Sequence, residues 1–390
     1  MNVCEHTILE ILKDKIKYGD EIVPVIVSKR FKDTTPSISL DTTSTNPIGE
    51  RYSSNCLLPL KFNHPLYDKT NPSKLYAQEV IISEMNLNLR IHIWTNNERE
   101  REVILSEIRA GEDDVEEYSF RKTNELAFRR GPLRYDIAGN KDTINEFKRD
   151  DLIAFYSRYY VPNNCFISVV SPCEYDRVYS LVLKYFGAWR YEKFSRNKVI
   201  VEKNIPCKKV SYKRDIGQNT IIYLFTFYGL SKREELALRI LDHKFGESGN
   251  SILFRKLREE KGLAYDVYSD LDLSDYVKTL YIYTSVREEG AESAVDVIEK
   301  CIDKIKNREI VFGGSTIALM KKVLKTSVAF TLENPVEIGN YILCQSMKGD
   351  SIYRFINDIK EIENIGEEDI HEVAKTVFKN PTIHILKKKS

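Results

Sequence analysis

The chain has 390 residues, of which 42% are hydrophobic and 30% are charged, as in an ordinary globular protein. Its 59 basic and 58 acidic side chains give a net charge of +1. No overall field therefore favours nucleic acid or an anionic membrane, and any partner must be recognised locally. The length exceeds what one hydrophobic core usually supports, so we expect two or three domains.

Several features favour a bacterial, cytoplasmic protein. No stretch approaches the ~18 apolar residues of a membrane helix. Residues 1–20 carry Glu5, Lys13 and Asp14 where a signal peptide needs an apolar core. The seven cysteines are odd in number and lack C-x-x-C spacing, which favours reduced thiols over a disulfide framework or a zinc ribbon. The many Ile, Lys, Tyr and Asn residues are typical of an AT-rich genome.

The first half of the chain reads as short alternating elements. Apolar periodicity predicts helices at 5–16, 76–85, 98–108, 150–156 and 176–186, and strands at 22–27, 36–40, 87–94 and 165–170. Residues 41–74 are rich in Thr, Ser, Asn and Pro, which indicates a loop. The polar stretch 190–205 is the expected domain boundary, and it divides the chain into residues 1–195 and 196–390.

The second half repeats the plan of the first. Strands are expected at 209–213, 220–228, 265–269, 278–285 and 382–386, and helices at 232–245, 251–261, 291–306, 315–327, 335–346, 352–357 and 367–377. The last strand is expected at a sheet edge. This order predicts an α+β fold of two similar domains, each a mainly antiparallel sheet covered by helices on one face. Two such halves indicate an ancient duplication.

The most informative stretch is S-I-L-F-R-K-L-R-E-E-K-G-L-A-Y-D-V-Y-S, residues 251–269. Its first apolar residues fall on one helical face, and Arg258 falls off that face. Gly262 is the expected end of the helix, after which the composition becomes strand-like around Tyr265. Arg258 and Tyr265 therefore flank one tight turn.

The run S-x-L-F-x-x-L-R-E-x-x-G-L-A-Y resembles the second-domain signature of the pitrilysin, insulysin and mitochondrial-processing-peptidase zinc peptidases, the inverzincins. In that family the Arg and the Tyr reach into the active site of the opposite half. The resemblance implies that Arg258 and Tyr265 bind substrate or stabilise the transition state. The plainer alternative makes Arg258 part of an ordinary helix-end ion pair and Tyr265 a half-buried strand aromatic.

A second match lies in the first half of the chain. Tyr160, Pro162 and Asn163 or Asn164 resemble the Tyr-x-Pro-x-Asn sequence with which a family helix turns into a central strand. Residues 139–144 occupy the place of the family's small Gly-containing turn. The resemblance therefore extends into the first domain.

The family's metal motif is missing from this sequence. Inverzincins carry H-x-x-E-H on a first-domain helix, where two histidines share a zinc ion and the Glu activates its water. No two of the six histidines here are close enough in sequence to share a helical turn. The nearest fragment, Asn2-Val-Cys-Glu5-His6, lacks the first His, and residues 52–63, where the zinc-binding helix would lie, hold C-L-L-P-L. We expect no zinc in this chain.

Glu100 and Glu107 match the family's acidic pair, whose second member is the third zinc ligand. Without the histidines, Glu107 is more simply a solvated helix carboxylate. Other chemistries have little support. Neither Gly246–Gly249 nor Gly313–Gly314 is followed by Lys-Ser/Thr, and no G-x-S-x-G occurs.

The resemblance implies a noncatalytic, substrate-binding subunit of a heterodimeric zinc metallopeptidase that processes peptides. A homologous partner bearing H-x-x-E-H would supply the metal. The chain is similar to the AlbE-like subunits of the bacterial AlbE/AlbF proteases, so a bacteriocin precursor or its leader peptide is an expected substrate. Two alternatives stay open. One is a structural or assembly subunit with this fold, like the core subunits of respiratory cytochrome complexes, and the other is a stand-alone peptide-binding module.

Overall fold

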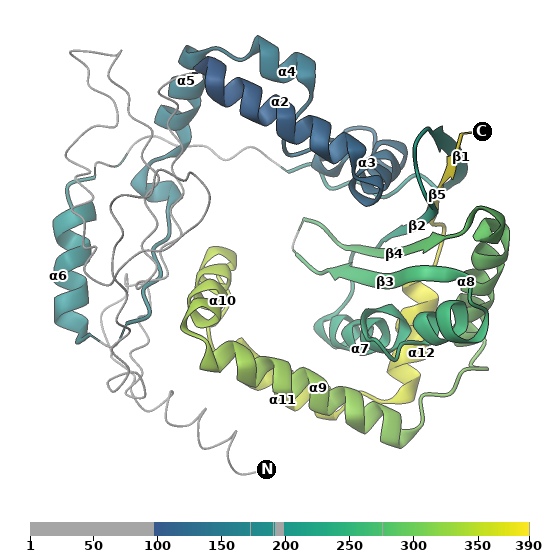
Figure 1. The fold of residues 1–390 in the computed structure, drawn as a ribbon. Helices are drawn as coiled ribbons and strands as arrows, with labels where there is room; N and C mark the ends of the chain where they lie inside the picture. The colour runs from purple at the N-terminus through teal and green to yellow at the C-terminus, as the bar shows by residue number, and fades with distance from the viewer. Residues whose placement is uncertain (1–96, 172, 190, 192–198, 275, 390) are drawn as a thin grey trace, which may run out of the picture. The chain divides into compact units, whose positions relative to one another are not determined.

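A computed structural model describes residues 97–171, 173–189, 191, 199–274 and 276–389 (Figure 1). The helices expected at 5–16 and 76–85, the strands expected at 22–27, 36–40 and 87–94, and the loop 41–74 lie outside the described residues. The chain forms two compact units. Unit 1 comprises Met1–Glu100, Phe147–Arg196 and Thr326–Phe355, and unit 2 comprises Arg101–Glu146, Asn197–Lys325 and Ile356–Ser390. The division into residues 1–195 and 196–390 stays a prediction.

Unit 2 contains a five-stranded sheet of order β1-β5-β2-β4-β3. Its strands are β1 (Cys207–Lys213), β2 (Asn219–Thr226), β3 (Ala264–Asp272), β4 (Thr279–Val286) and β5 (Thr382–Lys388). β5 pairs with β1 in parallel, and the other neighbours are antiparallel. A mainly antiparallel sheet is therefore confirmed.

The position expected for the last strand is wrong. β5 lies between β1 and β2 and is not at an edge. Its residues Thr382, Ile383, His384, Ile385 and Leu386 are all buried, which is typical of an inner strand covered on both faces. The edge strands of this sheet are β1 and β3.

Three helices cover one face of the sheet: α7 (Lys232–Asp242), α8 (Ala291–Lys306) and α12 (Glu367–Val377) (Figure 1). The structure gives α8 and α12 the bounds predicted from their apolar periodicity. The N-terminus of α7 is fixed by a capping box, in which the Ser231 and Glu234 side chains bond each other's backbone N–H groups. Fully buried side chains such as Leu238, Ile282 and Ile298 each contribute roughly 1.5–3 kcal/mol to this core.

A helix from the first half of the chain covers the other face. α3 (Val115–Ala127) places Phe120 against Tyr281 and Tyr283, with ring centroids 5.3 and 5.8 Å away. The Tyr281 hydroxyl donates a hydrogen bond to Asn124 at 2.7 Å. The expectation of helices on one face is therefore incomplete. This packing also explains why residues 101–146 belong to unit 2.

The described part of unit 1 contains helices and irregular backbone. Its helices include α5 (Arg149–Tyr159), α6 (Tyr175–Phe186) and α10 (Pro335–Lys348). The strand expected at 165–170 is wrong, because those residues have no strand partner in the described part of the chain. Val170 instead packs against Ile338 and Ile342 of α10.

The described residues contain further elements. They are the α-helices α2 (Asn97–Asp113), α4 (Lys141–Glu146), α9 (Gly314–Glu333) and α11 (Arg354–Glu363), the π-helices η5 (His243–Glu247) and η6 (Phe254–Glu260), and the 3₁₀ turns η3 (Pro132–Arg134), η4 (Pro162–Asn164) and η7 (Glu288–Gly290). In the predicted Tyr-x-Pro-x-Asn turn, Asn164 donates to the carbonyl of Tyr159 at 2.9 Å. None of the helices in the described ranges combines the length and apolar character that a membrane crossing needs.

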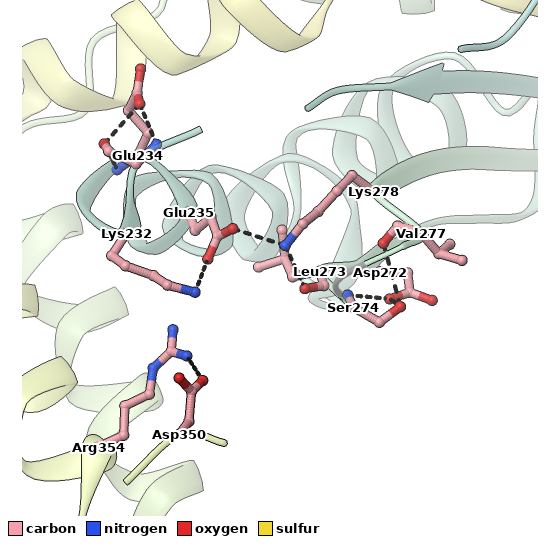
Figure 2. A network of polar contacts seen from close by, with 11 residues as sticks. Lys232, Glu234, Glu235, Asp272, Leu273, Ser274, Val277, Lys278, Asp350 and Arg354 are labelled. Carbon is pink, nitrogen blue, oxygen red and sulfur yellow. Dashed lines mark hydrogen bonds and ion pairs between the residues drawn. The ribbon is translucent and has the colours of Figure 1, made fainter. Parts of the chain in front are cut away.

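A largely buried ion pair connects Lys278, directly before β4, to Glu235 of α7. The ammonium of Lys278 lies 2.9 Å from a Glu235 carboxylate oxygen and donates to the carbonyl of Leu273 at 2.7 Å (Figure 2). Lys232 approaches the other Glu235 oxygen at 3.3 Å. Burial alone would raise the pKa of Glu235, but Lys278 outweighs it and holds the pKa below its ordinary value.

Candidate functional site

Arg258 lies on the π-helix η6, which directly precedes β3. Leu253 and Leu257 are fully buried in the core, and Arg258 is exposed, as the apolar spacing predicted. Gly262 ends the helix with φ +60°, a left-handed conformation that favours glycine. The N–H of Leu263 donates to the carbonyl of Leu257 at 2.8 Å and closes the turn into the strand.

The guanidinium of Arg258 has an aromatic neighbour. Its Cζ lies 5.1 Å from the centroid of the Phe254 ring, one helical turn earlier. The nearby carboxylate of Glu260 bonds Lys256 at 2.7 Å and lies 3.7 Å from Arg255. Among the residues that the structure describes, no acidic side chain pairs with Arg258, so the helix-end ion pair of the plainer alternative is not found. Its planar set of donors faces solvent and is available to a ligand.

Tyr265 stands at a β-bulge on the edge strand β3. The ladder pairs Ala264 with Val286 and Asp266 with Ser285, so Tyr265 is the extra residue on β3. Its side chain is 70% exposed, so it is not the half-buried aromatic of the plainer alternative.

The bulge decides the direction of Tyr265. Ala264 and Val267 are both buried in the core although they are three residues apart, and Tyr265 and Asp266 between them are both exposed. A regular strand alternates faces, which would place Tyr265 on the same face as Val267. Bulges commonly redirect side chains beside active sites. The tyrosine is therefore turned outward by backbone geometry that its spacing in the sequence does not reveal.

The neighbouring tyrosine has a structural role. The hydroxyl of Tyr268 donates to a carboxylate oxygen of Glu116 on α3 at 2.5 Å, and its ring lies 5.1 Å from that of Tyr283. Burial, followed by the bond to Glu116, raises the pKa of Tyr268. Tyr268 thus ties α3 to the sheet.

A buried carboxyl group, which no sequence pattern indicated, lies on the core side of β3. Ser269 Oγ donates to Asp242 Oδ1 at 2.5 Å, and Asp242 is only 5% exposed. Burial raises the pKa of Asp242 to about 7, with further repulsion from Glu247 and Asp270. Gly246 of η5 packs so closely on β3 that an added Cβ would lie 2.3 Å from Ser269 Oγ.

The described histidines do not fit a zinc site. His243 on η5 bonds Glu247 at 3.1 Å. The two ring nitrogens of His371 bond Ile305 and Glu367 at 2.8 and 3.3 Å. No group of three or more His, Cys, Asp or Glu residues in the described ranges could hold a metal ion.

The third described histidine, His384, and the two glutamates that match the family's acidic pair do not form a metal site in the described residues either. His384 Nε2 lies 2.6 Å from Ser211 Oγ, and burial lowers the pKa of His384 to about 4. Glu107 is exposed on α2, as expected of a solvated helix carboxylate, and Glu100 lies on the same helix. Residues 52–63 and the other three histidines lie outside the described residues.

Several known proteins are similar to this chain. Residues 146–310 match the family model described as the peptidase M16 inactive domain. An uncharacterised zinc protease of Mycobacterium leprae is 26% identical over 258 residues, covering 65% of this chain and 57% of that protein. The uncharacterised zinc protease YmxG of Bacillus subtilis is 25% identical over 284 residues, covering 72% and 67%. A protease structure from Helicobacter pylori gives a TM-score of 0.69 at 20% identity, covering 75% of this chain and 71% of that one.

The chain is therefore similar to the M16 inactive domain over residues 146–310 and to zinc proteases over a larger part of its length. Both Arg258 and Tyr265 lie within the range that matches the M16 inactive domain. The structural likeness confirms the fold, a sheet covered by helices. The chain spans only 57% of the M. leprae relative's length and about two thirds of the B. subtilis relative's, so the activity of a whole M16 peptidase is not carried over to it.

Proposed function

We propose that this chain is a noncatalytic, substrate-binding subunit of a heterodimeric zinc metallopeptidase. In this proposal Arg258 and Tyr265 complete the active site of a homologous partner that bears H-x-x-E-H. The observation that carries it is the bulge on β3, which presents Tyr265 to solvent at 70% exposure beside the helix end that holds Arg258.

Each of the two side chains has a role that suits its chemistry. The partner's zinc would supply the activated water. As the peptide carbonyl oxygen gains negative charge, the Tyr265 hydroxyl donates a hydrogen bond that strengthens with that charge. Losing such a donor typically costs ~10²-fold in turnover, or about 2.7 kcal/mol. Arg258, with its fixed fork of donors, grips a substrate carbonyl or carboxylate and contributes mainly to binding.

The finer parts of the proposal concern substrate and location. We propose that the substrate is held as an added strand along a sheet edge of the partner. By likeness to AlbE-like subunits, this substrate is a bacteriocin precursor or its leader peptide. A cytoplasmic location is supported by Cys165, Cys173, Cys207, Cys301 and Cys344, which are all free thiols.

Reconstitution with the partner subunit tests the proposal. Native mass spectrometry should show a one-to-one complex, and the chain alone should bind less than one equivalent of zinc and hydrolyse no peptide. In the complex, Tyr265→Phe should lower kcat ~10²-fold, and Arg258→Ala should mainly raise KM. The matched control is Tyr268→Phe, because that hydroxyl is committed to Glu116.

Each alternative has its own outcome. Wild-type kinetics in both the Tyr265→Phe and the Arg258→Ala complexes would show that the chain is a scaffold. Peptide affinity of the chain alone, with no complex formed, would favour the stand-alone binding module.

A further inference from the structure

The bulge at Tyr265 interrupts the backbone ladder between β3 and β4, and side chains bond the backbone groups beside it. The N–H of Asp266 donates to Ser285 Oγ at 3.2 Å. The hydroxyl of Thr284 donates to the carbonyl oxygen of Asp266 at 2.8 Å. The N–H of Val267 donates to the carboxylate of Asp266 at 2.9 Å. Both backbone groups of the residue after Tyr265 therefore depend on hydroxyls from the neighbouring strand.

These two hydroxyls are buried. Thr284 is 0% exposed and Ser285 is 4% exposed. Bonds to these hydroxyls replace the ladder bonds that the bulge removes, and without them the N–H and carbonyl of Asp266 would lose these partners. The rest of β4 is T-L-Y-I-Y ahead of this pair and Val286 after it. The two adjacent hydroxyl residues therefore stand opposite the bulge.

The bulge determines the direction of the Tyr265 side chain. In an unbulged register, strict alternation would direct the side chain of Tyr265 toward the face on which Val267 is buried. We propose that Thr284 and Ser285 are positioning residues, whose hydroxyls hold the bulge that turns Tyr265 outward. The catalytic consequence of this assignment rests on the function proposed above, whereas the structural consequence does not.

The chain offers a matched control for these hydroxyls. Thr382 on β5 is 0% exposed, and its hydroxyl donates to the carbonyl of Ile205 at 2.6 Å. Thr382→Val therefore removes a buried hydroxyl from the same sheet, on a strand that pairs with neither β3 nor β4. Thr284→Ser keeps the hydroxyl and serves as the conservative rescue.

The structural consequence is tested on the chain alone. In a Thr284→Val, Ser285→Ala double variant, the amide of Asp266 should exchange with deuterium roughly tenfold faster. N-acetylimidazole should acetylate Tyr265 at least about threefold more slowly, as the unbulged register becomes populated. Thr382→Val and Thr284→Ser should match wild type in both measurements. Unchanged acetylation of Tyr265 in the double variant would overturn the positioning role.

The catalytic consequence is tested in the reconstituted complex by a double-mutant cycle. Thr284→Val should lower kcat about tenfold in the wild-type background, and Thr284→Ser should restore it. In a Tyr265→Phe background, Thr284→Val should have no further effect, because the hydroxyl that it positions is already gone. A merely structural residue would lower activity equally in both backgrounds, and that result would contradict the positioning role.

The two proposals fail in different ways. If Tyr265→Phe alone leaves kcat unchanged, the proposed function fails, and acetylation of the free chain still decides whether Thr284 and Ser285 direct Tyr265. If Tyr265→Phe lowers kcat but the double variant leaves Tyr265 as reactive as in wild type, the proposed function stands and the positioning role fails.

Discussion

Replacement of Asp242 by Asn should change how the stability of the protein depends on pH. Asp242 is 5% exposed and accepts a hydrogen bond from Ser269 at 2.5 Å. The groups that act on its charge are Glu247 of η5 and Asp270 of β3, which disfavour it, and Arg239 of α7, which favours it. Burial dominates and raises the pKa of Asp242 from 3.8 to about 7.

The contribution of Asp242 to the free energy of unfolding depends on pH, because its pKa differs between the folded and unfolded states. Between pH 4 and 7 the folded state keeps the Asp242 proton and the unfolded state loses it, so the contribution of Asp242 to stability falls as pH rises. Below about pH 4 both states are protonated, and above about pH 7 both are ionised, so the contribution is constant outside this window. About three pKa units at 1.36 kcal/mol each give a loss of about 4 kcal/mol across it.

Asp242→Asn keeps the shape of the side chain and cannot titrate. Urea unfolding followed by circular dichroism, measured from pH 4 to pH 8, gives the free energy of unfolding of both proteins. The variant should gain about 4 kcal/mol relative to wild type between pH 4 and 7, with the difference level above that. Asp296→Asn, on an exposed ion pair with Lys300, is the control and should shift stability by less than ~0.5 kcal/mol. A pH-independent difference between Asp242→Asn and wild type would refute the reasoning.

Two further substitutions test the packing around β3 and β4. Lys278→Met should destabilise unit 2 by about 2 kcal/mol, because it leaves Glu235 with the more distant Lys232 and leaves the Leu273 carbonyl without the Lys278 donor. The control is Lys300→Met, from a solvent-exposed ion pair, which should cost under ~0.5 kcal/mol in the same urea titration. Equal losses of stability in the two variants would show that the Lys278 pair is no stronger than a surface pair. Gly246→Ala should cost about 2 kcal/mol or more, because its Cβ would lie 2.3 Å from Ser269 Oγ and 2.8 Å from the Ser269 backbone nitrogen. Gly249→Ala, where no atom lies within 4 Å of the added Cβ, should be near neutral, and a thermal melt in which the two alanine variants coincide would disprove the close approach.

Local patterns in the sequence are sufficient to predict many of the helices and strands of unit 2. Apolar residues at helical spacing predicted the bounds of α8 and α12. The helix, Gly262 and strand of residues 251–269 were also predicted, because each depends on the conformational preference of a few consecutive residues. The outward position of Arg258 followed from the same periodicity. The roles of Arg258 and Tyr265 in catalysis stay proposals.

Where the prediction failed, partners distant in the sequence decided the outcome. The sequence of β5 is compatible with an edge or an inner position, and pairing with β1 and β2 makes it an inner strand. Residues 165–170 have strand composition, but Val170 packs against a helix and the segment stays irregular. α3 lies on the second face of the sheet because Phe120 and Asn124 contact tyrosines of β4 there.

The sequence by itself determined that an arginine and a tyrosine flank one turn between a helix and a strand. It could not determine where the tyrosine points, since strand alternation alone would send Tyr265 toward the core. That direction depends on register, and register depends on Thr284 and Ser285 of a neighbouring strand bonding the backbone of Asp266. Only the tertiary structure brings these residues together, because the bulge is stable only where two strands already lie side by side.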